Sequence, residues 1–172
     1  LGDILIKLGL LSEAELLTRK SIDLNPKIAT SHKNLGAILI RYGKLKEAIN
    51  STNKAIELQP NFANAHNNLG LILKIMGKRK EAEISIKKAI EIRQDFPEAH
   101  YNLGILYEEE GNLQEAKVLW ERTIELDNNN ENAIFSLSKQ LSLELNYELA
   151  ISFLNKNNSE RCQSLHLGCL LG

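Results

Sequence analysis

The chain has 172 residues, of which 43% are hydrophobic and 25% are charged, which is ordinary for a globular domain that builds its own core. Lys and Arg number 21 and Asp and Glu 22, so the net charge is −1 and the balance gives no sign of the basic face that phosphate binding needs. We therefore expect no nucleic-acid partner. No apolar stretch reaches about 18 residues, so we also expect no membrane span.

The first residue and the cysteines predict whether the chain is part of a longer protein and in which compartment it is found. The chain begins at Leu1 without a Met, which predicts a piece of a longer protein. The two cysteines, Cys162 and Cys169, do not make a disulfide framework. Thiols without such a framework favour a reducing compartment, so the expected location is cytoplasmic.

Several residue types recur at a fixed spacing of 34 residues. The ladders are Gly2, Gly36, Gly70 and Gly104; Gly9, Gly43, Gly77 and Gly111; and Ala14, Ala48, Ala82, Ala116 and Ala150. Independent ladders in one register are typical of repeat architectures, in which each unit is one small supersecondary structure.

This register divides the whole chain, in order, into complete and incomplete repeats. Residues 1–28 are a repeat without its first six positions, residues 29–62, 63–96 and 97–130 are complete, residues 131–160 are degenerate, and residues 161–172 start a further repeat. In the fifth repeat Ser138 replaces the first glycine, Leu145 replaces the turn glycine, and Asn157 fills a position that favours a small residue.

Each complete repeat is predicted to form two helices. Between Ala65 and Met76, apolar residues recur at steps of three and four, the pattern of an amphipathic helix. Gly77 then supplies a residue suited to ending it. A second helix is expected from about Lys80 to Ile92. Small residues where the two helices meet allow close packing, and the apolar face left over must be buried by stacking neighbouring hairpins.

The 34-residue spacing, the Leu-Gly pair in the first helix, the turn glycine and the alanines resemble the tetratricopeptide repeat, and Ala65-His66-Asn67-Asn68-Leu69-Gly70 resembles the repeats of O-linked N-acetylglucosamine transferase-type proteins. The resemblance implies an all-α, right-handed superhelical solenoid of antiparallel helix hairpins. It also implies a protein-interaction module whose first helices line a concave groove. No phosphate-binding loop or catalytic motif appears, so we expect neither enzyme activity nor a cofactor.

The positions that bind ligands in this family map onto a set of polar and aliphatic residues here. The predicted peptide-binding residues are Lys33, Asn34, Arg41, Asn67, Asn68, Leu71, Lys74, Tyr101, Asn102 and Ile105. Asn34, Asn68 and Asn102 form a ladder of amides, which offer both donors and an acceptor to a peptide backbone. The alternative is that these amides bond neighbouring helices or water.

Charge is uneven along the predicted groove. Lys7, Lys33, Arg41 and Lys74 belong to the first three repeats, and Glu98, Glu108 and Glu109 to the fourth. A bipolar partner fits this gradient, whereas the simpler interpretation is a solvated polar face. Some chaperone-binding members of the family hold a carboxylate with a clamp of basic and amide side chains. In this chain the clamp is incomplete, because Ala37 and Leu71 occupy clamp positions.

Histidines and cysteines recur in the chain, but their spacing gives only a weak indication of a metal site. His32, His66 and His100 recur every 34 residues and are expected to pack between repeats with one polar tip satisfied. Cys162, His166 and Cys169 share one face of a predicted helix and are all of zinc-ligand type. Without a fourth ligand, coincidence is the favoured interpretation, and we expect no metal site.

Three functions remain after these arguments. The main prediction is a module that binds a peptide or protein segment in its concave groove. The first alternative is the substrate-recognition arm of a larger transferase-type enzyme. The second is an architectural or self-assembling array, with end-to-end association through uncapped terminal repeats.

Overall fold

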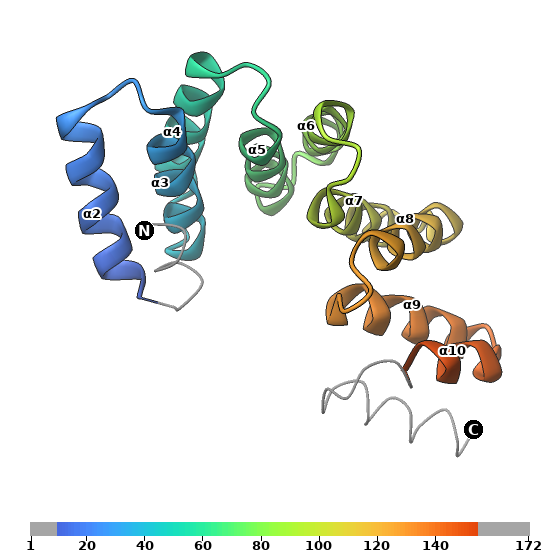
Figure 1. Cartoon of the computed structure of the whole chain (residues 1–172). Coiled ribbons are helices and arrows are strands. Elements are labelled where there is room, and N and C mark those ends of the chain that lie inside the picture. The colour runs from blue at the N-terminus through green and yellow to red at the C-terminus, as the bar shows by residue number, and fades with distance from the viewer. Residues whose placement is uncertain (1–9, 155–172) are drawn as a thin grey trace. The chain divides into compact units, whose positions relative to one another are not determined.

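A computed structural model describes residues 10–154, and this part consists of helices joined by short turns, without any strand (Figure 1). The described helices are α2 (Leu11–Leu24), α3 (Ala29–Arg41), α4 (Leu45–Leu58), α5 (Ala63–Ile75), α6 (Arg79–Ile92), α7 (Pro97–Glu109), α8 (Leu113–Leu126), α9 (Glu131–Leu143) and α10 (Tyr147–Leu154). The prediction of an all-α chain with two helices per repeat is confirmed. No described helix has both the length and the apolar character that a bilayer crossing requires.

The helices group into two compact units, Leu1–Gln94 and Asp95–Gly172, called here the N-terminal and the C-terminal unit. In the N-terminal unit α3 pairs with α4 and α5 with α6, while α4 packs on α5, α3 on α5, and α2 on α3. In the C-terminal unit α7 pairs with α8 and α9 with α10, and α8 packs on α9. Each hairpin is therefore buried by its neighbour within its own unit, as stacked repeats require.

The turn inside each complete repeat is made by a glycine in the left-handed region. Gly43, Gly77 and Gly111 have φ angles of +71°, +77° and +83°. The next residue closes the turn, because the Lys78 amide donates to the Leu73 carbonyl at 2.9 Å. A residue without Cβ takes this conformation at little cost, so the predicted role of these glycines is confirmed. Leu145 takes the same place in the fifth repeat with a φ of +60°.

The glycines of the first helices mark the closest approach within each hairpin. A Cβ built on Gly70 would meet the Ile86 side chain and would lie 3.1 Å from the Ala82 carbonyl oxygen. On Gly104 it would lie 2.6 Å from Nε1 of Trp120. Ser138 is fully buried at the matching place, and its hydroxyl donates to the Ala150 carbonyl at 3.5 Å. The degenerate fifth repeat therefore keeps the hairpin by giving the serine hydroxyl an acceptor.

The core of the array follows from the alanine ladder. Ala14, Ala48, Ala82, Ala116 and Ala150 are all completely buried. In the C-terminal unit Trp120 fills the interior beside Ala116 and packs with Ile134 and Leu137. Alanine at every second helix lets the hairpins approach, and larger apolar side chains fill the space beside it.

Candidate functional site

The predicted groove residues of the N-terminal unit lie on two neighbouring helices, α3 and α5. These helices pack against each other in register, because the Asn68 side chain of α5 donates to the Lys33 carbonyl of α3 at 3.5 Å. We call this surface the α3–α5 face. Its predicted members are Lys33, Asn34, Arg41, Asn67, Asn68, Leu71 and Lys74. The fold therefore brings together predicted residues from two successive repeats.

Two members of the asparagine ladder, Asn34 and Asn68, are partly or largely covered. Asn34 is only 7% exposed, and its Oδ1 is covered and has no hydrogen-bond partner within the described residues. Asn68 is half-buried and already uses its amide to join α5 to α3. For Asn68, the alternative in which the amide bonds a neighbouring helix is therefore observed. Asn67 is also buried.

The accessible part of the α3–α5 face is cationic and aliphatic. Arg41 is exposed, Lys33, Leu71 and Lys74 are half-buried, and Ile75 at the end of α5 is 54% exposed. No carboxylate occupies the positions of α3 or α5, since neither helix contains Asp or Glu. This surface can contact aliphatic side chains and attract anionic groups.

The predicted residues of the C-terminal unit lie on α7. Tyr101, Asn102 and Ile105 are all half-buried. Tyr101 and Ile105 pack against the apolar cluster of α8, α9 and α10, so both contribute to the core as well as to the surface. Glu108, at the end of α7, lies 3.8 Å from Lys139 of α9.

The histidine ladder has a structural role where its contacts are described. Nε2 of His32 lies 2.8 Å from the Pro26 carbonyl oxygen, and Nε2 of His66 lies 2.9 Å from that of Pro60. Since a carbonyl can only accept, Nε2 carries the proton in both rings. The predicted satisfied polar tip is confirmed for His32 and His66, and the packing of the rings between repeats stays a prediction.

No metal centre is visible in the described part of the chain. Residues 10–154 contain no group of three His, Cys, Asp or Glu side chains arranged to hold an ion. Cys162, His166 and Cys169 lie outside the described residues, as do Lys7 and the whole of segment 161–172.

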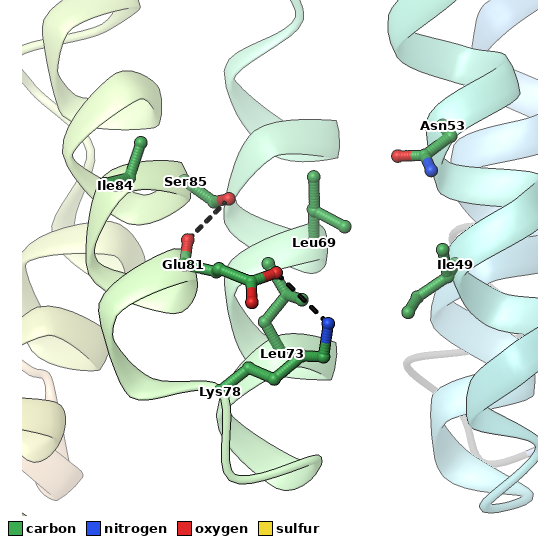
Figure 2. A pocket seen from close by; sticks show the side chains of 8 residues that line it. All are labelled: Ile49, Asn53, Leu69, Leu73, Lys78, Glu81, Ile84 and Ser85. Carbon is green, nitrogen blue, oxygen red and sulfur yellow. Dashed lines mark hydrogen bonds and ion pairs between the residues drawn. The ribbon is translucent and has the colours of Figure 1, made fainter.

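Sequence reasoning missed a groove on the other side of α5, between α4 and α6 (Figure 2). Its lining residues are Ile49, Asn53, Leu69, Leu73, Lys78, Glu81, Ile84 and Ser85, and its volume is about 400 Å³. A second cavity of about 650 Å³ shares Leu69, Ile84 and Ser85 with the first. The available signal was Ile84, an aliphatic residue that is 70% exposed on α6.

Sequence reasoning also missed a separation of charge between the two units. The N-terminal unit has 16 Lys and Arg against 9 Asp and Glu, a formal charge of +7. The C-terminal unit has 5 against 13, a formal charge of −8. The total of −1 concealed this polarity, which a count for each repeat separately would have revealed.

Solved structures of similar fold agree with the observed hairpins. PilF of Pseudomonas aeruginosa superposes with a TM-score of 0.83 at 20% identity, covering 99% of this chain and 80% of that one. A thermophilic tetratricopeptide repeat protein of Thermus thermophilus gives a TM-score of 0.83 at 16% identity, with coverages of 99% and 96%. YrrB, a repeat protein with an unusual peptide-binding site, gives 0.63 at 23% identity, with coverages of 99% and 87%. At these identities the likeness shows the fold alone.

Sequence families add an independent finding. No curated protein sequence matches the chain. Residues 63–96 and 97–130 each match the family described as Tetratricopeptide repeat, and residues 38–77 match the one described as TPR repeat. Together these matches run from residue 38 to residue 130, more than half of the chain, and with the repeated hairpins they show that it belongs to the tetratricopeptide repeat family.

Proposed function

We propose that this chain is a protein-interaction module and that the α3–α5 face, the predicted concave groove, binds a segment of another protein. The observation that carries the proposal is the packing of α5 on α3, with the Asn68 side chain bonded to the Lys33 carbonyl. It supports a shared surface for Lys33, Arg41, Leu71 and Lys74 of two repeats. A repeat protein of similar fold is described as having a peptide-binding site, which supports this type of activity.

The chemistry of the face favours a segment with aliphatic and acidic side chains. Leu71 and the exposed Ile75 offer apolar contact, and burying such side chains is worth about 25 cal/mol per Å² of apolar area. Arg41 is exposed, and a guanidinium can hold a carboxylate through two parallel hydrogen bonds. The bipolar partner expected from the sequence stays a prediction, because the acidic residues of α7 belong to the other unit.

The transferase-type segment does not favour the enzyme alternative, because packing accounts for its residues. Ala65 is completely buried, His66 bonds the Pro60 carbonyl, and Asn68 bonds α3. Gly70 admits the Ile86 side chain. Since these residues serve the array itself, they carry no information on a catalytic domain, and we propose a binding module without catalysis.

The experiment selects short random peptides displayed on phage against the purified chain and measures their affinities by fluorescence anisotropy. The test variant is Arg41→Ala with Leu71→Ala, and the matched control is Ile84→Ala, which trims an exposed aliphatic residue of the α4–α6 groove. We expect the test variant to weaken binding at least about tenfold, or ~1.4 kcal/mol, with the control unchanged. Loss of binding in the control variant alone would move the site to the α4–α6 groove.

Asparagine variants are less suited to this test. Replacing Asn68 with Ala removes a hydrogen bond between repeats, so weaker binding would not separate a lost contact from a displaced helix. Arg41 is exposed at the end of α3, so its removal is expected to leave the fold unchanged.

A further inference from the structure

The intra-repeat turns of the N-terminal unit form a strongly cationic surface, called here the basic edge. It consists of Lys44, Lys46, Lys78, Arg79 and Lys80, together with the part-exposed Tyr42 and Met76. The two turns lie side by side, since Ile49 at the start of α4 and Lys78 before α6 line one cavity. Only two carboxylates, Glu47 and Glu81, lie at these turns among the described residues, and Glu81 pairs with Lys78 at 3.3 Å.

The intra-repeat turns of the C-terminal unit form a surface of opposite charge, called here the acidic edge. It consists of Glu109, Glu110, Glu115 and Glu148 with the exposed Leu143, Leu145 and Leu149. Its two turns are joined by an ion pair of 2.8 Å between Lys117 of α8 and Glu144 at the end of α9. Both edges therefore combine exposed apolar side chains with charge of a single dominant sign.

Much of this charge opposes the helices that carry it. Lys78, Arg79 and Lys80 stand at the start of α6, where the helix dipole is positive and disfavours cations. Glu109 and Glu110 stand at the end of α7, where the dipole is negative and disfavours anions. Lys78 is partly offset by its pair with Glu81, whereas for the other residues the helix dipole gives no stabilisation.

We propose that the basic edge of one molecule binds the acidic edge of a second copy of this chain. Each edge finds its complement in the other, with cations against carboxylates and with Tyr42 and Met76 against the exposed leucines. Such a contact joins unlike surfaces, so it either closes a symmetric assembly or extends into a chain of molecules. The contact uses the turn residues and not the predicted peptide-binding residues of α3 and α5.

The test measures mass by sedimentation velocity over a concentration series of the whole chain. The basic-edge variant is Arg79→Glu with Lys80→Glu, and the acidic-edge variant is Glu109→Lys with Glu110→Lys. Each reversal suits the local helix dipole, so both variants are expected to fold. The control, Lys20→Glu with Lys27→Glu, makes the same charge change in the N-terminal unit at exposed positions away from the edge.

We expect the wild type and the control to associate equally. Each edge variant alone should associate at least about tenfold more weakly. The basic-edge variant then has two acidic edges, and the acidic-edge variant has two basic edges. An equal mixture of the two variants should therefore recover association. Raising NaCl from about 0.1 M to about 1 M shortens the Debye length from about 10 Å to about 3 Å and should dissociate the wild type.

Other outcomes overturn the proposal. A monomeric wild type at every concentration in low salt excludes the contact, and so does a mixture of the two variants that stays monomeric. If the wild type stays monomeric but binds phosphatidylserine vesicles and the basic-edge variant does not, the basic edge serves an anionic membrane instead.

Discussion

At the scale of single residues, Leu145 occupies the turn between α9 and α10. It takes the left-handed conformation that glycine takes in the other turns, with a φ of +60°. For a residue with Cβ this conformation costs roughly 1–2 kcal/mol. The Leu145 side chain is 73% exposed, so little packing offsets the cost within the chain.

We therefore expect Leu145→Gly to stabilise the fold by roughly 0.5–1 kcal/mol, the strain removed less the extra entropy of glycine in the unfolded chain. Urea unfolding followed by circular dichroism measures the change. The matched control is Gly77→Ala, in a turn of φ +77°, which should destabilise by about 1 kcal/mol. A Leu145→Gly variant no more stable than the wild type would contradict a strain larger than the entropic cost of glycine.

At the scale of helices, the pair of Lys117 and Glu144 joins the fourth hairpin to the fifth. The hydrogen bond from Lys117 holds the pKa of Glu144 below its usual value of 4.5, and Gln140 contributes a second hydrogen bond. A carboxyl group with a lowered pKa in the folded chain stabilises it above the unfolded-state value and loses that effect as the pH falls through the folded-state value. The Glu144 side chain is 34% exposed, so screening limits the contribution to about 1 kcal/mol or less.

The corresponding variant is Glu144→Gln. We expect it to be less stable than the wild type at neutral pH and equally stable below the folded-state pKa of Glu144, as measured by urea unfolding over a pH series. Glu125→Gln is the matched control, because Glu125 forms an exposed pair with Arg122 inside one helix at 2.8 Å. A difference between wild type and Glu144→Gln that persists unchanged in acid would contradict this role for the pair.

The repeat ladders predict elements well but do not separate framework from ligand contacts. Gly77 and Ala82 were predictable, because turn conformation and close packing demand particular residue types. The role of Asn68 was not predictable. An amide that bonds the next helix and an amide that binds a peptide recur with the same 34-residue period. Ser138 was interpreted as a defect, since only the folded chain shows its hydroxyl beside the Ala150 carbonyl.

At the scale of the whole molecule, the net charge of −1 hid a separation of charge between the two units. The two units carry formal charges of +7 and −8, and the boundary between them, after Gln94, follows from contacts rather than from composition. The α4–α6 groove was hidden for a related reason: Ile49, Leu69 and Ile84 come from three helices, and their convergence depends on how hairpins stack. Local periodicity in the sequence is enough to predict the hairpins. A surface made by several hairpins can be identified only once their packing is known.

Stacked repeats couple mainly to their neighbours, so local stability should vary along the array. The α9–α10 hairpin has Ser138 in place of a glycine and Leu145 strained at its turn, whereas the α5–α6 hairpin has Gly70 and Gly77. We expect amide hydrogen exchange to give α5 a protection free energy about 1–2 kcal/mol above that of α9. Leu145→Gly should narrow this gap, because it relieves the turn of α9 and leaves α5 untouched. Uniform protection in both helices, unchanged by that substitution, would mean that the described repeats unfold only as one cooperative body.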